Sequence, residues 1–152
     1  MLFSSTCQHA LRALVYLSVH QDRWPILVRE IAAAESIPRP FLSKILHDLN
    51  KKGLLASSKG PGGGYGLARP PSQIQIREII EAIDGPLDVD TGCVLGLDEC
   101  SDDAPCALHD FWKPFRAQYK DAMNGLSLAD AALTLSKKRQ HDEDVGVERE
   151  KN

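Results

Sequence analysis

Residues 59–69, KGPGGGYGLAR, place five glycines and a proline between two basic residues. The flanking segments LLASS and YGLAR are short and strand-like, so this stretch predicts a β-hairpin with a glycine-rich tip. Glycine-rich loops that bind nucleotides end in Gly-Lys-Ser/Thr, or carry G-x-G-x-x-G ahead of a helix. The glycine spacing fits neither pattern, and the sequence that follows is strand-like. The hairpin is therefore not expected to bind a nucleotide.

The sequence before the hairpin predicts two helices joined by a tight turn. The first helix fits residues 28–35, VREIAAAE, and the turn SIPRP follows it, because a residue before proline avoids the helical region. The second helix has one apolar stripe with the i, i+3, i+4, i+7 spacing of a buried face. The stripe consists of Leu42, Ile45, Leu46 and Leu49. Two such helices are a helix-turn-helix candidate, and the hairpin after them has the position of a wing.

The opposite face of the second helix is polar and suits contact with DNA, although an ordinary surface helix has the same pattern. It carries Ser43, Lys44, His47 and Lys51. In the hairpin, glycine lets the backbone approach phosphates or enter the minor groove, and Lys59 supplies the positive charge that this groove attracts. A plain flexible turn is the alternative. The predicted tip spans Gly60 to Gly64, and the predicted DNA-contacting glycines are Gly60, Gly62 and Gly63.

The net charge of −3 hides a strong segregation of charge along the chain. Residues 38–69 hold six Lys and Arg, Arg39 among them, against Asp48 alone, which is a local charge of +5. Residues 78–110 hold ten carboxylates and no Lys or Arg. The first segment attracts a polyanion such as DNA, and the second repels it. Two solvated surfaces explain each segment alone but not their separation.

Hydrophobic periodicity predicts further helices at residues 5–20, 74–83, 108–124 and 128–135. The expected fold class is mainly α with a small β-hairpin: a winged helix-turn-helix plus a long helix. The predicted parts are the winged helix-turn-helix at 1–70, a connecting helix and cysteine loop at 71–106, the long and C-terminal helices at 107–136, and a disordered, charged tail at 137–152.

The sequence also bounds where the protein works and what it does there. It has no run of 18 or more apolar residues and no recognisable signal peptide, so we expect no membrane segment and a cytoplasmic location. In that compartment, four cysteines are metal ligands or redox groups more often than structural disulfides. The chain offers no nucleophile–base pair and no paired carboxylates of defined spacing, so we expect no enzymatic activity.

Three cysteines lie close together as C-x6-C-x5-C, and a histidine follows as C-x2-H; they are Cys93, Cys100, Cys106 and His109. Thiolates and imidazole suit an iron–sulfur cluster or zinc. A helix that begins near Cys106 places Cys106 and His109 one turn apart on the same face. The spacing does not choose between the two metals, and cysteines without a function are the alternative to both. Cys7 lies far away in the first helix and is expected in the core.

The chain resembles the bacterial winged-helix regulators that include the iron–sulfur biogenesis regulator IscR and the nitric-oxide sensor NsrR. GPGGGY, the preceding FLSKILHDLNKKGLL and the three cysteines before the long helix carry this resemblance, which runs from about Leu2 to Leu135. It implies a homodimer that binds a palindromic operator in double-stranded DNA, with the recognition helix in the major groove and the wing in the adjacent minor groove. By position, these contacts fall on Pro38, Pro40, Ser43 and Lys59. Some members carry glutamate at the position of Ser43, which leaves the operator sequence open.

The resemblance also implies that the long helix forms the dimer interface, through Trp112, Phe115, Tyr119 and Met123. It further implies that the three cysteines hold an iron–sulfur cluster, 2Fe–2S in preference to 4Fe–4S. IscR-like members take a histidine three residues after the third cysteine as the fourth ligand, which is His109 here. NsrR-like members take an aspartate from the first helix of the partner subunit, where this chain has Gln8 with His9 beside it. The first cysteine gap is six residues rather than the usual five.

The predicted function is a DNA-binding transcriptional regulator whose operator affinity is set by a cluster that senses redox state, nitric oxide or iron–sulfur status. One alternative is a repressor of the same fold that works through thiols or zinc. The other is an iron–sulfur carrier or electron-transfer protein, which would leave the basic helix and the glycine-rich wing unexplained.

Overall fold

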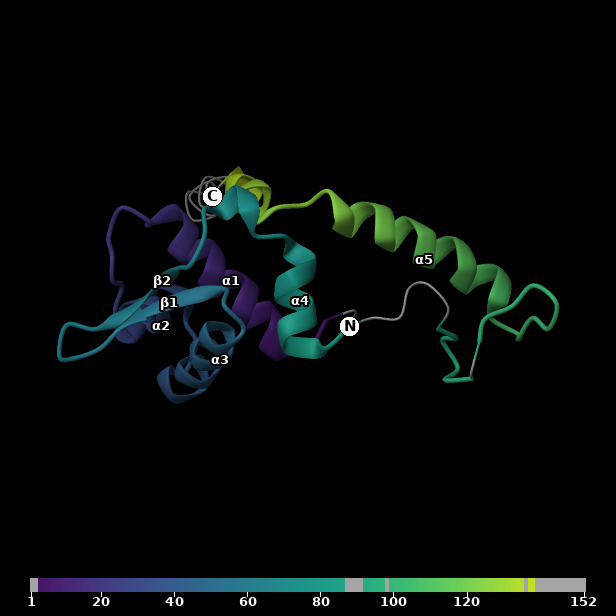
Figure 1. Cartoon of the computed structure of the whole chain (residues 1–152), viewed down its shortest axis with the longest axis horizontal. Helices are drawn as coiled ribbons and strands as arrows, with labels where there is room; N and C mark the ends of the chain where they lie inside the picture. Colours follow the sequence, from purple (N-terminus) through teal and green to yellow (C-terminus); the bar gives the residue numbers. More distant parts are fainter. Residues whose placement is uncertain (1–2, 87–91, 98, 136, 139–152) are drawn as a thin grey trace, which may run out of the picture.

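The computed structural model describes residues 3–86, 92–97, 99–135 and 137–138 (Figure 1). In chain order its elements are α1 Ser5–Val19, α2 Val28–Glu35, α3 Arg39–Lys51, β1 Leu55–Ser58, β2 Gly64–Leu67, the 3-10 helix η1 Pro71–Gln73, α4 Ile76–Asp84 and α5 His109–Asn124. Residues 128–135 are also helical. The predicted helices and hairpin are confirmed, while residues 139–152 of the predicted tail lie outside the described residues. Within the described part of the chain, no helix is long and apolar enough to cross a membrane.

Helix α1 is the centre of the core. The Ser4 side chain caps it by accepting a hydrogen bond from the Cys7 N–H at 3.0 Å, and the Ser4 N–H donates to Asp84 at the end of α4. The buried face of α1 packs on α2, α3, α4 and β2. Its fully buried side chains are Cys7, Ala10, Ala13, Leu14 and Leu17. Cys7 is therefore a core residue, as its position in the sequence predicts.

Helices α2 and α3 form the predicted helix-turn-helix. Helix α2 ends at Ser36, whose left-handed backbone, with φ 52° and ψ 44°, turns the chain toward α3. The apolar stripe of α3 is buried, as its spacing predicts. Between α1 and α2, Arg12 donates to the fully buried carboxylate of Glu35 at 3.1 Å. This ion pair compensates a charge that would otherwise be costly to bury.

The hairpin is the predicted wing, and it is fastened to the body by backbone hydrogen bonds. Strands β1 and β2 are antiparallel, with Leu55 opposite Leu67. The return strand begins at Gly64, one residue earlier than the sequence predicts. Tyr65 and Ile26 exchange two backbone hydrogen bonds of 3.0 and 2.9 Å. The wing is therefore held by the segment that connects α1 to α2.

Helix α5 extends from this body as a long arm (Figure 1). After the arm the chain returns to the start of α4. The Ile76 N–H donates to the Leu126 carbonyl at 2.9 Å, and the Leu128 N–H donates to the Ile74 carbonyl at 2.8 Å. These two bonds tie the base of the arm to the domain that carries the helix-turn-helix.

The close approach at Gly64 generates a stability prediction. A Cβ at Gly64 would overlap the backbone carbonyl of Ile26, whereas a Cβ at Gly62 would meet nothing within 4 Å. We expect Gly64→Ala to lower the free energy of unfolding by about 1–3 kcal/mol, the usual cost of forced overpacking. Gly62→Ala should leave it nearly unchanged. Urea denaturation of both variants measures the difference, and equal midpoints would contradict this account of the wing's attachment.

Candidate functional site

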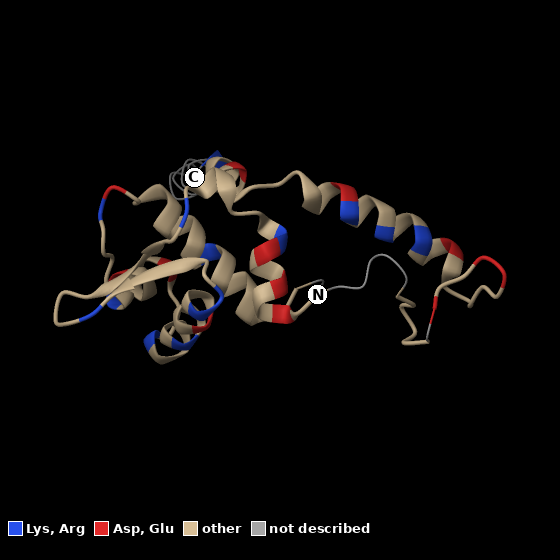
Figure 2. Ribbon diagram, in the orientation of Figure 1, with Lys and Arg blue, Asp and Glu red and all other residues tan. Residues whose placement is uncertain are grey.

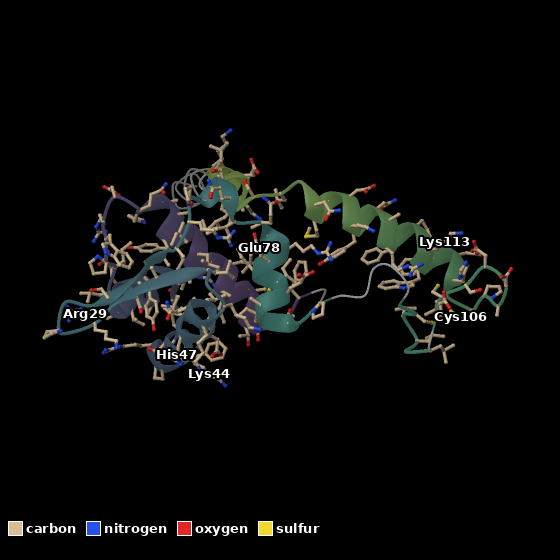
Figure 3. The ribbon with its side chains drawn as sticks, in the orientation of Figure 1. Arg29, Lys44, His47, Glu78, Cys106 and Lys113 are labelled. Carbon is tan, nitrogen blue, oxygen red and sulfur yellow. The ribbon has the colours of Figure 1, made fainter. Side chains whose placement is uncertain are left out.

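The first candidate site is the surface formed by α3 and the wing. Because the apolar stripe faces the core, the other side of α3 is open to solvent: Pro38, Arg39, Pro40, Lys44 and His47 are exposed, and Ser43 is half-buried. Figure 3 shows Lys44 and His47 at the end of the molecule opposite the tip of α5. The blue segments of the ribbon in Figure 2 mark Lys and Arg along α3 and one position in the hairpin.

The wing tip combines one exposed cation with a tight backbone turn. Lys59, Gly60 and Gly62 are exposed, and Gly63 is partly covered. The Gly63 N–H donates to the Gly60 carbonyl at 2.9 Å, and a Cβ at Gly63 would overlap the carbonyl of Ser58. A larger residue cannot occupy this turn without moving the backbone. The tip is therefore a narrow edge of peptide groups beside a single lysine, a shape that suits a nucleic-acid groove.

Arg29 is a residue of this surface that the sequence reasoning missed. It lies in the first turn of α2 and is exposed, and Figure 3 shows it at the same end of the molecule as Lys44 and His47. In helix-turn-helix proteins the first helix of the motif crosses the DNA backbone, where a cation is favourable. A count of charges over both helices of the motif, rather than from residue 38 onward, would have included it.

The second candidate site is the cysteine loop at the far end of α5. The structure arranges the four predicted ligands as two close pairs. The Sγ atoms of Cys93 and Cys106 are 3.8 Å apart, and Cys100 Sγ lies 3.3 Å from Nδ1 of His109. Within the described ranges, no three possible ligands converge on a point that could hold one metal ion. Each of the four predicted ligands therefore contacts one other predicted ligand, in the pairs Cys93–Cys106 and Cys100–His109.

Several interactions fasten this loop to the first turns of α5. The Trp112 indole N–H donates to the Gly92 carbonyl at 2.7 Å. Nε2 of His109 lies 2.7 Å from Asp102, and Lys113 donates to both oxygens of the same carboxylate at 2.8 and 2.7 Å. Hydrogen bonds from Lys113, and then from His109, lower the pKa of Asp102. The loop is thus attached by side chains that α5 itself positions.

The cysteines differ in environment. Burial, followed by the nearby Asp84 carboxylate, raises the pKa of Cys7 to about 11. In the loop, backbone N–H groups of Leu95 and then Leu97 donate to Cys93 and lower its pKa. The two first-helix residues considered as a fourth ligand lie on α1. Gln8 is exposed, and the His9 ring is edge-on to Phe41 of α3, with ring centroids 5.6 Å apart.

The predicted dimerisation residues are partly covered by the chain itself. Trp112, Phe115 and Tyr119 stack in series along α5, with centroids 5.3 and 6.4 Å apart, and Tyr119 is buried. Met123 packs against the core at the base of the arm. The most exposed aromatic ring of α5 is Phe111, with 66% of its surface accessible. Phe111 was not among the predicted residues, because it lies beside the periodic stripe rather than in it.

A match to the Rrf2 family, described as iron-dependent transcriptional regulator, spans residues 3–133. The chain is 41% identical over 132 residues to a candidate HTH-type transcriptional regulator of Aquifex aeolicus, covering 86% of this chain and 90% of that protein. It is 29% identical over 130 residues to the HTH-type transcriptional regulator IscR of Aliivibrio salmonicida, covering 86% and 76%.

Solved structures have the same fold. The structure named T. potens IscR superposes with a TM-score of 0.69 at 25% identity, covering 90% of this chain and 89% of that one. CymR, the global cysteine regulator of B. subtilis, gives a TM-score of 0.70 at 23% identity, covering 87% and 96%. The fold is that of a winged-helix transcriptional regulator. The chain belongs to the Rrf2 family, and the resemblance expected from its glycine-rich wing and cysteine spacing is confirmed.

The contrast between Cys7 and the loop cysteines generates a reactivity prediction. Thiolate is the form that reacts with iodoacetamide, and Cys7 is fully buried with a raised pKa. We expect metal-free folded protein to be alkylated at the three loop cysteines and not at Cys7, with Cys93 reacting at the lowest pH because its pKa is lowered. Peptide mass spectrometry after timed labelling, with and without denaturant, measures this. Labelling of Cys7 in folded protein at the rate of Cys100 would contradict it.

Proposed function

We propose that this chain is a homodimeric, DNA-binding transcriptional regulator of the cytoplasm whose affinity for a palindromic operator is set by an iron–sulfur cluster. Cys93, Cys100, Cys106 and His109 would hold the cluster, and 2Fe–2S is the form that suits them best. The observation that carries this proposal is the arrangement of the four ligands in two pairs.

The distances within the pairs fit metal ligands. Two thiolates about 2.3 Å from one tetrahedral metal lie about 3.8 Å from each other, and the sulfurs of Cys93 and Cys106 are 3.8 Å apart. An imidazole ligand sits nearer to its metal, so a thiolate–imidazole edge is shorter, and Cys100 and His109 are 3.3 Å apart. A binuclear cluster takes two ligands on each iron, whereas a single zinc ion takes all four at one point. The pairs therefore favour the cluster over zinc.

The protein's own residues give the site its connection to DNA. A bound cluster supplies reversible redox and nitrosylation chemistry. Ligation by residues on both sides of the loop would hold it against α5, and a change at the site would shift the population of dimer geometries. In a dimer, two recognition helices must lie about one DNA turn apart, roughly 34 Å, to bind a palindrome. Small changes in that separation alter operator affinity.

The shape of α5 supports the homodimer. The arm extends away from the domain, and Phe111 and Leu108 near its tip are 66% and 41% exposed (Figure 1). Apolar side chains on a projecting helix gain stability when a second surface covers them. We therefore extend the predicted dimerisation surface, Trp112, Phe115, Tyr119 and Met123, to include Phe111.

A thiol-based switch is the second candidate, since Cys93 and Cys106 are close enough to form a disulfide after a small movement. The carrier or electron-transfer alternative has lost its support, because the chain belongs to a family of transcriptional regulators and displays a basic surface on its helix-turn-helix.

Cofactor content tests the cluster directly. Anaerobically purified protein should be coloured and contain about two iron and two sulfide per chain, as a 2Fe–2S cluster requires. Cys93→Ser should lose the colour, and the control Cys7→Ala should retain it because Cys7 lies in the core. Colourless protein with stoichiometric zinc after anaerobic reconstitution would refute the cluster. A Cys93–Cys106 disulfide that forms and controls DNA binding without any metal would favour the thiol switch.

Salt dependence tests the DNA surface. Each phosphate contact contributes about 0.9 to the slope of log K against log salt, so Lys44→Ala and Lys59→Ala should each weaken binding to all sequences and reduce the slope by about one. Arg29→Ala should act in the same way. Lys120→Ala, which removes one charge from the arm, is the matched control. Fluorescence anisotropy over a salt series gives the slopes, and equal slopes for Lys59→Ala and Lys120→Ala would argue against wing contact.

A further inference from the structure

The ring of His109 has a different partner on each nitrogen. Nδ1 lies 3.3 Å from Cys100 Sγ, and Nε2 lies 2.7 Å from Oδ1 of Asp102. The side chain of His109 is only 7% exposed, whereas that of Asp102 is 68% exposed. The histidine is thus held between a candidate metal ligand on one side and a solvent-facing carboxylate on the other.

Lys113 keeps the exposed carboxylate in place. It lies four residues after His109 in α5, so both side chains project from one face of the helix. Its ammonium group donates to both oxygens of Asp102, at 2.8 and 2.7 Å. Helix α5 therefore positions His109 directly and positions Asp102 through Lys113.

A neutral imidazole has one N–H donor and one acceptor nitrogen. An ionised carboxylate only accepts, so in the neutral form of His109 the contact with Asp102 favours the proton on Nε2 and leaves the lone pair of Nδ1 toward Cys100 Sγ. Histidines that bind metals commonly donate their other N–H to a carboxylate, which orients the ring and makes the ligand more basic. The Asp102–His109 contact has this arrangement.

We propose that Asp102, held by Lys113, is a positioning residue that prepares His109 to bind the cluster through Nδ1, on the same iron as Cys100, while Cys93 and Cys106 share the other iron. This inference rests on the proposed function, because it assigns roles around the same site. It assigns Nδ1 of His109 as the binding nitrogen and one pair of ligands to each iron. It also gives Asp102 a role, although Asp102 is not itself a ligand.

The test compares Asp102→Ala with Asp103→Ala, which removes the same charge from the neighbouring exposed position. Loss of a carboxylate that orients a metal-binding histidine lowers metal affinity or activity by about 10- to 100-fold. Cluster loss to a chelator should therefore be about tenfold faster in Asp102→Ala and unchanged in Asp103→Ala. Lys113→Met should change it in the same direction. In a His109→Cys background, Asp102→Ala should have no effect, because the group that it positions is gone.

Pulsed EPR of the reduced cluster, in protein labelled with ¹⁵N at the δ1 position of histidine, identifies the bound nitrogen. A strong coupling that disappears in His109→Cys is expected. Coupling to the ε2 nitrogen instead, equal behaviour of the Asp102 and Asp103 variants, or an Asp102 effect that persists in the His109→Cys background would overturn the positioning role alone. Parent protein without iron and sulfide after anaerobic reconstitution would overturn the proposed function and this inference with it.

Discussion

The burial of α1 is the constraint on which the DNA-facing surface depends. This helix packs on α2, α3, α4 and β2 together, and side chains such as Leu14 and Leu17 are almost completely buried there. Because α3 is held by its apolar stripe and the wing by the backbone of Ile26, both orientations derive from the same core. The Asn50 side chain also donates to the Leu55 carbonyl at 2.8 Å and joins α3 to the hairpin, so the polar face of α3 and the wing tip point outward together.

The segregation of charge in the sequence is in part a separation in space, although Glu78 lies on α4 and pairs with Arg69 at 2.7 Å. Lysines and arginines lie on α3, in the hairpin and along α5, while the loop at the tip of α5 carries carboxylates that include Asp102 and Asp103 (Figure 2). The net charge of −3 therefore conceals segments of opposite sign. The carboxylates of the loop repel DNA phosphates, whereas the basic residues of the winged domain attract them.

Local periodicity was sufficient to predict the helix-turn-helix, the hairpin and the buried position of Cys7, because each follows from side-chain spacing or punctuation by glycine and proline. The cysteine site was predictable only as a set of residues. Its division into two pairs depends on the path of the loop, which the Trp112–Gly92 hydrogen bond helps to fix and which no repeat in the sequence reveals. The role of Asp102 depends in the same way on a contact across seven residues. Phe111 was missed because exposure depends on which face of α5 the loop covers.

The projecting form of α5 has a mechanical consequence. Its 16 residues span about 24 Å at 1.5 Å per residue, with Pro114 inside the helix, where one backbone N–H donor is missing. Over this length, a rotation of α5 by about 5° at its base moves its tip by about 2 Å. A displacement of about 2 Å at the tip corresponds to the same rotation at the base. The backbone hydrogen bonds of Ile76 and Leu128 hold the base of α5 about which such a rotation occurs. In the proposed regulator, the bending of α5 at Pro114, between these bonds and the cysteine loop, would set how much of a change at the loop reaches the winged domain.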